Sequence, residues 1–449
     1  MKIRNLIFFL GIAWTGAALA GCTKHSYPSD KIKDALRQIC REEYGIEDID
    51  VKTAGETIGV YLPLKKLFAA DFKEAAITGK IRNLETLFEP SPEALEKVED
   101  VLFSISRVLL STDKKFKFYV LQATDTEKTG LQLILTGNVE DVKRVRVWDI
   151  SRNEYRKRVI HELRLNRAVM WHRPVRQFFK DLENLSFPDL EGKYFGNDLP
   201  PGTMQSLFLN KVTQGKEAKP KLQWEIKDIR SALIQKNEVI VYVKVRPHPS
   251  GQEGTTDLQY LFMLSLNEEE AHILRIVPFQ YQNQNGEIQN IPFPKELQIE
   301  HNLDKWEQEF PLEDLQLGPF LGQQLTRRVQ ALAAGDERIQ NTFRDSKLNF
   351  DYSEEPPPPH FALNIEATLK DFNHYSRQSL VFHEDMLYLL NLASREFVDV
   401  LRSYQFGDYH YLSLNLPQEP SHWILGREDL ELFRRKKVDL QGLLAVPKI

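Results

Sequence analysis

The chain has 449 residues, of which 42% are hydrophobic and 27% are charged, and its formal net charge at pH 7 is −5. These fractions are typical of a folded protein, and the length allows two or three domains with their own hydrophobic cores. The acidic balance excludes a protein that binds nucleic acid through an overall positive charge.

The first 21 residues have the layout of a secretory signal peptide. Lys2 and Arg4 precede an apolar run from Leu6 to Leu19, and small residues follow it. With the small residues Ala20 and Gly21 the segment offers about 16 positions, fewer than the roughly 20 that a membrane-spanning helix needs. We therefore expect residues 1–21 to be a signal peptide and residues 22–29 to be a tether.

The segment ends with the four residues Leu-Ala-Gly-Cys, which resemble the lipobox of bacterial lipoproteins. The resemblance covers residues 1–22. It implies that the Cys22 thiol receives a diacylglyceryl group, becomes the mature N-terminus and anchors the chain in the bacterial cell envelope, where more than one acyl chain is needed for stable anchoring. Thr23 after the cysteine favours the outer over the inner membrane, with the chain facing the periplasm. The open alternative is an ordinary secretory signal in which Cys22 is incidental.

Residues 30–180 are expected to form an α+β domain. The spacing of apolar residues predicts one helix that is capped by Ser29 and ends at Gly45, and a second helix that is capped by Ser91. Runs of β-branched and aromatic residues predict strands. These strands are expected at residues 49–52, 57–64, 116–125, 131–138 and 142–151.

Residues 181–221 are dense in glycine, proline and charge, a composition that indicates a linker. The following residues 222–300 are expected to form a β-rich antiparallel domain, in which Asn285 and Gly286 predict a tight hairpin turn. Strands are expected in this domain at residues 239–246, 258–266 and 272–279.

Residues 301–449 are expected to form another α+β domain. Helices are expected at residues 320–347 and 384–404, and strands at residues 361–369 and 409–416. A Pro-rich loop at 354–360 interrupts them, because consecutive prolines adopt extended polyproline geometry and cannot join a helix or a central strand.

The fold class is therefore predicted to be α+β, with helices packed on antiparallel sheets in two to three domains. A helix followed by a strand occurs near both ends of the chain, but the spacing differs and the identities are too few to predict an internal repeat.

The sequence contains none of the motifs GxxxxGK[ST], GxGxxG, GxSxG and HExxH. The sequence therefore carries no local signature of a P-loop protein, a dinucleotide-binding protein, a serine hydrolase or a zinc protease. The histidines are scattered, so no catalytic residue, metal ligand or cofactor is predicted. Cys40, on the apolar face of the first helix, is expected to be a buried and inert thiol.

One segment is strongly basic, since residues 143–180 hold 12 basic and three acidic residues with aromatic residues interleaved. It predicts a docking surface for an acidic partner. The candidate residues are Arg144, Arg146, Trp148, Arg152, Arg156, Lys157 and Arg158. Export makes anionic lipid headgroups, lipopolysaccharide or an envelope protein the expected partners, and not nucleic acid. The alternative is that these arginines form solvated faces and pair with acidic stretches such as residues 300–314.

Two hypotheses about function follow from the anchor and the missing motifs. The first is a membrane-anchored envelope lipoprotein that acts as a non-catalytic interaction or assembly module, held to membrane lipid by acylated Cys22. The second is an envelope enzyme that acts on polymer or lipid substrates with a site assembled from distant residues. A deep pocket with clustered acid and base side chains would favour the enzyme, and an exposed basic or apolar patch would favour the interaction module.

Overall fold

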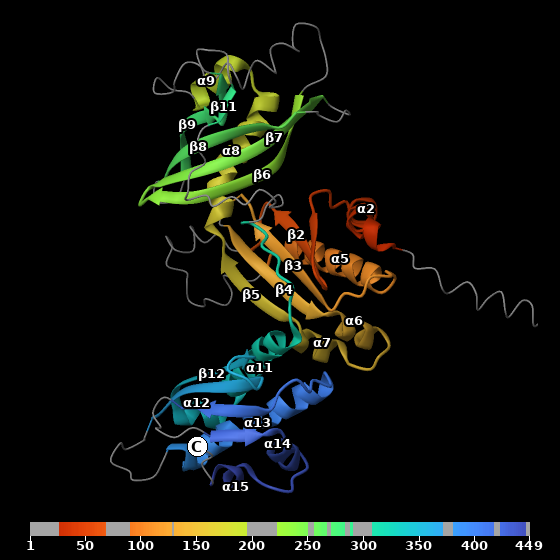
Figure 1. Ribbon diagram of the computed structural model, residues 1–449, viewed down its shortest axis with the longest axis vertical. Helices are drawn as coiled ribbons and strands as arrows, with labels where there is room; N and C mark the ends of the chain where they lie inside the picture. Colours follow the sequence, from red (N-terminus) through yellow and green to blue (C-terminus); the bar gives the residue numbers. More distant parts are fainter. Residues whose placement is uncertain are drawn as a thin grey trace, which may run out of the picture. The chain divides into compact units, whose positions relative to one another are not determined.

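The computed structural model of the protein describes most of the chain after the tether (Figure 1). The described residues are 27–68, 90–127, 130–194, 222–249, 256–266, 271–282, 288–290, 308–370, 380–416 and 423–445. Residues 1–26 with Cys22, and the predicted turn at Asn285 and Gly286, lie outside them. Within the described residues helices pack on mostly antiparallel sheets, so the predicted α+β fold class is confirmed.

The described residues divide into two compact units, each built from several segments of the chain. The first unit takes its residues from Met1–Ala54, Ile58–Ile134 and Glu162–Glu313. The second takes its residues from Gly55–Thr57, Leu135–His161 and Asp314–Ile449. Whether the expected domains 30–180, 222–300 and 301–449 fold on their own stays a prediction.

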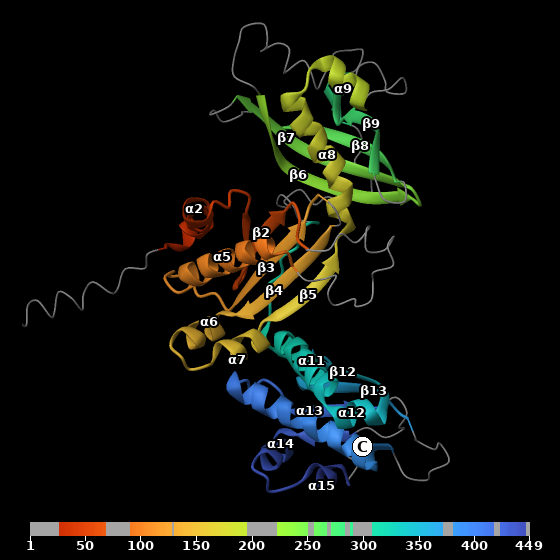
Figure 2. The same ribbon diagram turned by 180° about the vertical axis from the view of Figure 1, so that it is seen from behind.

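A five-stranded sheet in the order β1-β2-β3-β4-β5 lies mainly in the first unit (Figure 2). Its strands are β1 (Asp50–Ala54), β2 (Thr57–Leu64), β3 (Phe118–Asp125), β4 (Leu131–Asn138) and β5 (Ile160–Leu165). Helices α2 (Ile32–Tyr44) and α5 (Pro92–Leu109) pack against each other beside the sheet. The N–H of Thr126, just after β3, donates to the carbonyl of Leu64 at the end of β2 over 2.9 Å, as expected for a parallel pair joined through α5.

The ends of the two helices largely follow the sequence prediction. The Ser91 hydroxyl caps α5, and Gly45 ends α2 in the left-handed conformation with a φ of 65°. The prediction of Ser29 as the cap of α2 is wrong, because Ser29 opens the short 3₁₀ helix η1 (Ser29–Lys31) and α2 follows it without a side-chain cap. Cys40 is fully buried, as predicted, and burial raises the pKa of its thiol.

The prediction of a strand at residues 142–151 is wrong. These residues form most of helix α6 (Val139–Arg146) and the turn that leads into helix α7 (Arg152–Arg158). The valines in this segment favour a strand, but the Asn138 side chain accepts a hydrogen bond from the N–H of Glu140 and starts a helix. Local capping therefore outweighs β-propensity here.

The first unit also contains a four-stranded antiparallel sheet in the order β6-β7-β8-β9. Its strands are β6 (Leu222–Gln235), β7 (Glu238–Pro249), β8 (Leu258–Leu266) and β9 (Ala271–Pro278). The expected antiparallel meander is thus confirmed. Two short strands, β10 (Gln280–Gln282) and β11 (Ile288–Asn290), pair antiparallel beyond β9.

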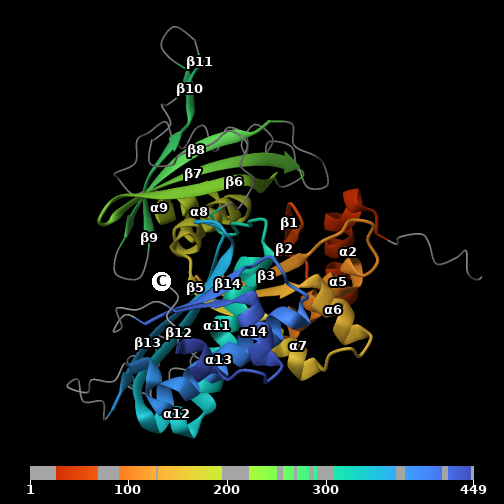
Figure 3. The same ribbon diagram turned by 60° about the horizontal axis from the view of Figure 1, so that its bottom comes forward.

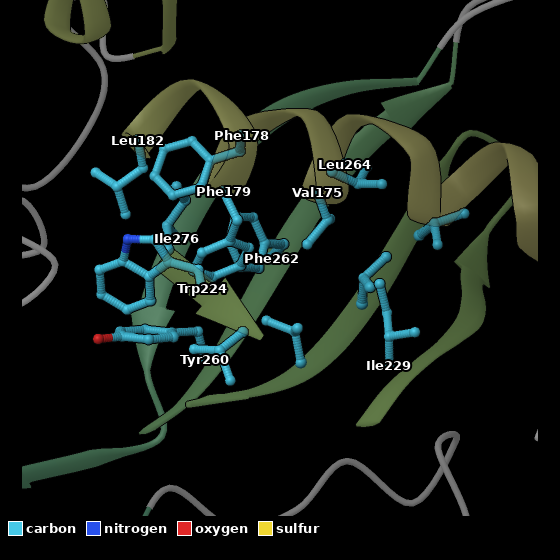
Figure 4. Close-up of a cluster of buried hydrophobic side chains, with 14 of the residues drawn as sticks. Val175, Phe178, Phe179, Leu182, Trp224, Ile229, Tyr260, Phe262, Leu264 and Ile276 are labelled. Carbon is cyan, nitrogen blue, oxygen red and sulfur yellow. The ribbon is translucent and has the colours of Figure 1, made fainter. Parts of the chain in front are cut away.

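Helix α8 (Arg167–Asn184) lies along one face of this sheet and contributes Val175, Phe178, Phe179 and Leu182 to its core (Figure 4). Phe178 and Phe179 of α8 both make edge contacts with Phe262 of β8, with ring centroids 5.5 and 5.8 Å apart. Leu182 and Leu190, the latter in helix α9 (Phe187–Tyr194), are fully buried in the same core.

The predicted linker at 181–221 is therefore wrong in its first part. Residues 181–184 end α8 and residues 187–194 form α9, both packed on the sheet, and residues 195–221 lie outside the described residues. Apolar residues at helical spacing outweigh the glycine and proline content of residues 181–194.

The second unit contains a four-stranded sheet in the order β12-β13-β14-β15 (Figure 3). Its elements are α11 (Leu317–Gly335), α12 (Glu337–Thr342), β12 (Phe343–Ser353), β13 (His360–Leu369), η3 (Leu380–Phe382), α13 (Glu384–Ser403), β14 (Tyr411–Asn415), β15 (Trp423–Gly426), α14 (Arg427–Arg434) and α15 (Leu440–Leu444). The helix expected at 320–347 is too long, because β12 begins at Phe343. The Pro-rich loop is confirmed as irregular and joins antiparallel β12 and β13.

The two units share one order of elements that the sequence did not predict. A helix, two strands, a helix and two strands follow one another as α2-β1-β2-α5-β3-β4 and as α11-β12-β13-α13-β14-β15, with the short α12 and η3 inserted in the second. In both sheets these strands lie in chain order, and β13 pairs parallel with β14 as β2 does with β3. The order and the pairing of these elements thus repeat, although few residues of the two segments are identical.

Candidate interaction surface at the corner between α6 and α7

The basic stretch of the second unit forms a helical corner in which α6 and α7 lie side by side (Figure 3). We call residues 143–158 the α6–α7 corner. The N–H of Asp149 donates to the carbonyl of Arg144 over 2.9 Å, and the Ser151 hydroxyl accepts from the N–H of Glu154 over 3.0 Å. The first bond closes the end of α6 and the second caps α7, so the turn between them is fixed at both ends.

Arg158 holds the inner side of the corner together. It is only 6% exposed, and its guanidinium donates to Asp141 over 2.8 Å and to Glu154 over 2.9 Å. Burial disfavours the charged guanidinium, but the Asp141 carboxylate outweighs burial and raises the pKa of Arg158. Arg158 is therefore a structural ion-pair partner, and the prediction that it belongs to an exposed docking surface is corrected.

The same inner side is bound to the end of helix α13. Arg144 donates to the Ser403 carbonyl over 3.0 Å, and Arg158 donates to the Ser403 hydroxyl over 2.5 Å. Tyr404 donates its hydroxyl to Asp141, while Gln324 of α11 donates to the Arg158 carbonyl over 2.7 Å. Arg144 is thus also engaged, since it pairs with Asp149 at 2.5 Å as well. These bonds fix the corner on two helices of its own unit.

The outer side of the corner carries an exposed apolar tip. Val147 is 71% and Trp148 is 79% exposed, and Trp148 has a φ of 63°. This left-handed conformation costs roughly 1–2 kcal/mol for a residue with a side chain. Large aromatic side chains normally bury most of their surface, so an exposed tryptophan on a fixed turn indicates a binding surface.

Four basic side chains of the corner are exposed, namely Arg146, Arg152, Arg156 and Lys157. None of them forms an ion pair with any residue that the structure describes. Of the seven residues predicted from the sequence, five are exposed on the corner, namely these four and Trp148. The other two, Arg144 and Arg158, are used to build it.

The remainder of the basic stretch belongs to the first unit. There Arg164 pairs with Glu162 at 2.5 Å, Arg173 donates to the Glu127 carbonyl, and Arg176 pairs with Glu309. The Arg176–Glu309 pair joins the basic stretch to residues 300–314, as the alternative interpretation of the stretch predicts. One run of sequence thus holds both exposed basic side chains, such as Arg152 and Arg156, and arginines used in internal pairing, such as Arg158 and Arg176.

A second polar cluster, which sequence reasoning missed, lies inside the first unit. Glu309 and His172 are both 0% exposed, and His172 Nδ1 and Arg176 each contact the Glu309 carboxylate. The Tyr61 hydroxyl donates to Glu309 over 3.2 Å, and His172 Nε2 lies 2.9 Å from the Ser231 hydroxyl. These residues come from four distant segments of the chain, so no local motif signals them.

The charge states of this cluster follow from burial and from Arg176. Burial disfavours an ionised Glu309, but the Arg176 charge and the hydrogen bonds from His172 and Arg176 outweigh burial and hold the pKa of Glu309 at about 2. Burial lowers the pKa of His172, and its hydrogen bond to Glu309 opposes this only in part. A neutral imidazole bound to a carboxylate resembles an acid–base pair, but both groups are inaccessible to a substrate.

The cluster instead clamps the segment Gln308–Phe310. Gln122 of β3 and Gln132 of β4 both donate to the Glu309 carbonyl, and Lys52 of β1 donates to the Phe310 carbonyl over 3.0 Å. Gly59 of β2 lets this segment come close, because a Cβ there would lie 2.6 Å from the Phe310 ring. We call Gln308–Phe310 the clamped segment.

The described residues contain no helix that is long and apolar enough to cross a membrane. They also contain no group of three or more histidine, cysteine or acidic side chains that could hold a metal ion. Comparison with protein families, with curated proteins and with solved structures finds no match to this chain.

Proposed function

We propose that this chain is a lipid-anchored protein of the bacterial envelope that acts as a non-catalytic interaction module, tethered at Cys22 and docking through the α6–α7 corner. The observation that carries the docking role is Trp148, which is 79% exposed on a fixed turn of a corner whose four exposed basic side chains form no ion pair with a described residue. The lipobox resemblance of residues 19–22 supports the anchor.

The chemistry of the corner favours an anionic lipid surface as its partner. Tryptophan side chains concentrate at the boundary between headgroups and acyl chains, where the ring is apolar and its N–H finds polar partners. Each lysine or arginine near an anionic membrane contributes about 1 kcal/mol, so the exposed Arg146, Arg152, Arg156 and Lys157 of the corner would add to the affinity for such a surface. An acyl anchor would keep the corner at a high local concentration near such a surface.

Binding to lipid vesicles tests this role. The probe is the chain from Thr23 onward, which lacks the acyl chains and retains every residue that the structure describes. We expect it to sediment with vesicles that contain phosphatidylglycerol, less with phosphatidylcholine alone, and less at high salt. The double variant Arg152→Glu, Arg156→Glu should bind about tenfold more weakly and keep the melting temperature, because both side chains are exposed.

A matched control changes the same amount of charge elsewhere in the second unit. Arg395 and Lys437 are exposed and form no ion pair with a described residue, so Arg395→Glu with Lys437→Glu should leave vesicle binding within about twofold of the unchanged chain. Equal losses in the two double variants would show that net charge and not the corner matters. Capture of an acidic envelope protein without vesicle binding would replace lipid by protein as the partner.

The alternative hypothesis of an envelope enzyme gains no specific support from the described residues. Among them, Glu309, His172 and Ser231 come nearest to an acid–base group, and these side chains lie in the interior of the first unit. Turnover of an envelope polymer or lipid by the purified chain would revive that hypothesis.

A further inference from the structure

A pocket of about 350 Å³ lies in the second unit between the end of helix α13 and helix α14. Apolar and aromatic side chains form part of its lining, namely Leu401, Phe406, Tyr409 and Leu430. Its volume corresponds to about a dozen non-hydrogen atoms if each takes roughly the 30 Å³ of one water molecule. The pocket is therefore of a size for a small organic molecule or the last residue of a peptide.

The wall of the pocket is basic. Arg402, Arg427, Arg434 and Arg435 line it together with a single carboxylate, Glu431. Arg434 donates twice to Glu431, over 2.8 and 2.6 Å, and Arg435 donates to it over 2.7 Å. These two guanidiniums share one acidic partner, and their hydrogen bonds hold the pKa of Glu431 at about 2. The other two arginines, Arg402 and Arg427, have no acidic partner among the described residues.

Arg427 is held in place at the pocket by contacts that do not neutralise its charge. Its Nη1 donates to the Gly407 carbonyl over 3.0 Å, and its guanidinium carbon lies 5.7 Å from the centre of the Tyr409 ring. A Cβ on residue 407 would stand 3.2 Å from Nη2, so glycine lets the guanidinium pack closely on the backbone. A backbone carbonyl and an aromatic face orient the group, but neither neutralises it.

Arg402 supplies the second unneutralised charge. It lies in the last turn of α13, where a cation is also favoured by the helix dipole, and its side chain lines the pocket. Two guanidiniums from different elements thus line the pocket together with its apolar residues. Guanidinium groups bind carboxylates through paired N–H donors, and an aliphatic body would be removed from water against the apolar residues.

We propose that this pocket binds an organic carboxylate with an aliphatic body, its carboxylate held by Arg402 and Arg427 and its apolar part on Leu401, Phe406 and Leu430. Two sources have this chemistry. One is a medium-chain fatty acid, and the other is the C-terminal carboxylate of a peptide that ends in an aliphatic residue. The site is independent of the α6–α7 corner and of the anchor at Cys22.

Titration with small probes tests the proposal. The chain from Thr23 onward is titrated with octanoate, with N-acetylleucine as a mimic of a peptide C-terminus, and with octanol, and binding is followed by calorimetry. We expect a dissociation constant of about 1 mM for at least one of the two carboxylates. The tighter carboxylate identifies the source, and octanol should bind at least about fivefold more weakly because it lacks the charge.

Variants locate the binding. Arg427→Gln and Arg402→Gln should each weaken the preferred carboxylate at least about fivefold. Arg395→Gln is the matched control, since Arg395 is an exposed arginine of the same helix α13 that does not line the pocket. Equal binding by Arg427→Gln and Arg395→Gln would overturn the proposal, as would absence of binding by both carboxylates or equal binding of octanol.

Discussion

Trp148 combines an unfavourable backbone conformation with an exposed indole, and the two have separate energetic effects. Its φ of 63° lies in the left-handed region, which glycine adopts without cost. Its ring is 79% exposed, so it contributes little packing to the folded state. A residue that lowers stability and packs poorly at a fixed turn is retained most readily for what it binds.

Replacement of Trp148 by glycine should therefore raise stability and lower membrane binding at once. We expect Trp148→Gly to increase the free energy of unfolding by about 0.5–1 kcal/mol, because the left-handed conformation no longer costs energy while the unfolded glycine chain gains some entropy. Urea unfolding measures the first effect and vesicle sedimentation measures the second.

The matched control is Trp148→Ala, which removes the ring and keeps a Cβ in the left-handed conformation. It should lose vesicle binding as Trp148→Gly does, without the gain in stability. A loss of stability in the glycine variant would mean that the indole packs in solution and that the corner is not a free surface.

The clamped segment Gln308–Phe310 behaves as an element of structure although it is neither a helix nor a strand. Side chains from β1, β3 and β4 hold its carbonyls, and Glu309 connects it to Arg176 and His172 of α8. Removing the Glu309 charge would take away the buried carboxylate with which Arg176 pairs. Breaking a buried pair in this way costs about 3 kcal/mol.

The stability contributed by Glu309 should depend on pH in a defined direction. Its pKa is about 2 in the folded chain against 4.5 for an exposed glutamate, so the unfolded chain binds more protons between these pH values. The contribution is complete above pH 4.5 and is lost as the pH falls through about 2. The pKa of His172 is also lowered on folding, so the unfolded chain takes up the histidine proton at a higher pH than the folded chain does. Stability therefore also falls with falling pH in this higher range.

We therefore expect Glu309→Gln to be destabilised by about 3 kcal/mol at pH 7, with a smaller difference from the unchanged chain at pH 3. Urea midpoints at the two pH values measure this. Glu313→Gln is the control, because Glu313 is exposed in the same stretch of chain, and it should change the midpoint little at either pH. A difference that stays constant with pH would show that Glu309 is not ionised in the fold.

At the scale of the whole molecule, local signals in the sequence predicted local structure well. The cap at Ser91, the stop at Gly45 and the β-branched runs of β7 and β8 depend on neighbouring residues, and all three predictions are confirmed. The strand expected at 142–151 failed where a cap at Asn138 competed with β-propensity.

Features that depend on distant residues could not be predicted. The basic run in the sequence indicated Arg152 and Arg156 correctly as exposed charges, but the same run contains Arg158, whose burial depends on Ser403, 245 residues away. Likewise Glu309 meets His172 across 137 residues, and no spacing rule connects them. The composition of the sequence therefore indicated the candidate surface, but it did not indicate which of the arginines in it are buried.

Anchoring at Cys22 is a prediction about the whole molecule, since the residue lies outside the described residues. We expect Cys22→Ser to move the chain from the membrane fraction to a salt-extractable or soluble fraction, because the α6–α7 corner alone binds electrostatically and acyl chains do not respond to salt. The variant should melt at the unchanged temperature. Retention of Cys22→Ser in salt-washed membranes would contradict the lipid anchor.

The clamped segment also sets a condition on the order of folding. Lys52 and Phe310, which bond to each other, are separated by 258 positions. Contacts between such distant positions close large loops and form slowly. A chain that emerges N-terminus first must therefore present β1, β3 and β4 before residues 308–310 arrive, so the bonds from Lys52, Gln122 and Gln132 to this segment cannot form until the chain has been synthesised past Phe310.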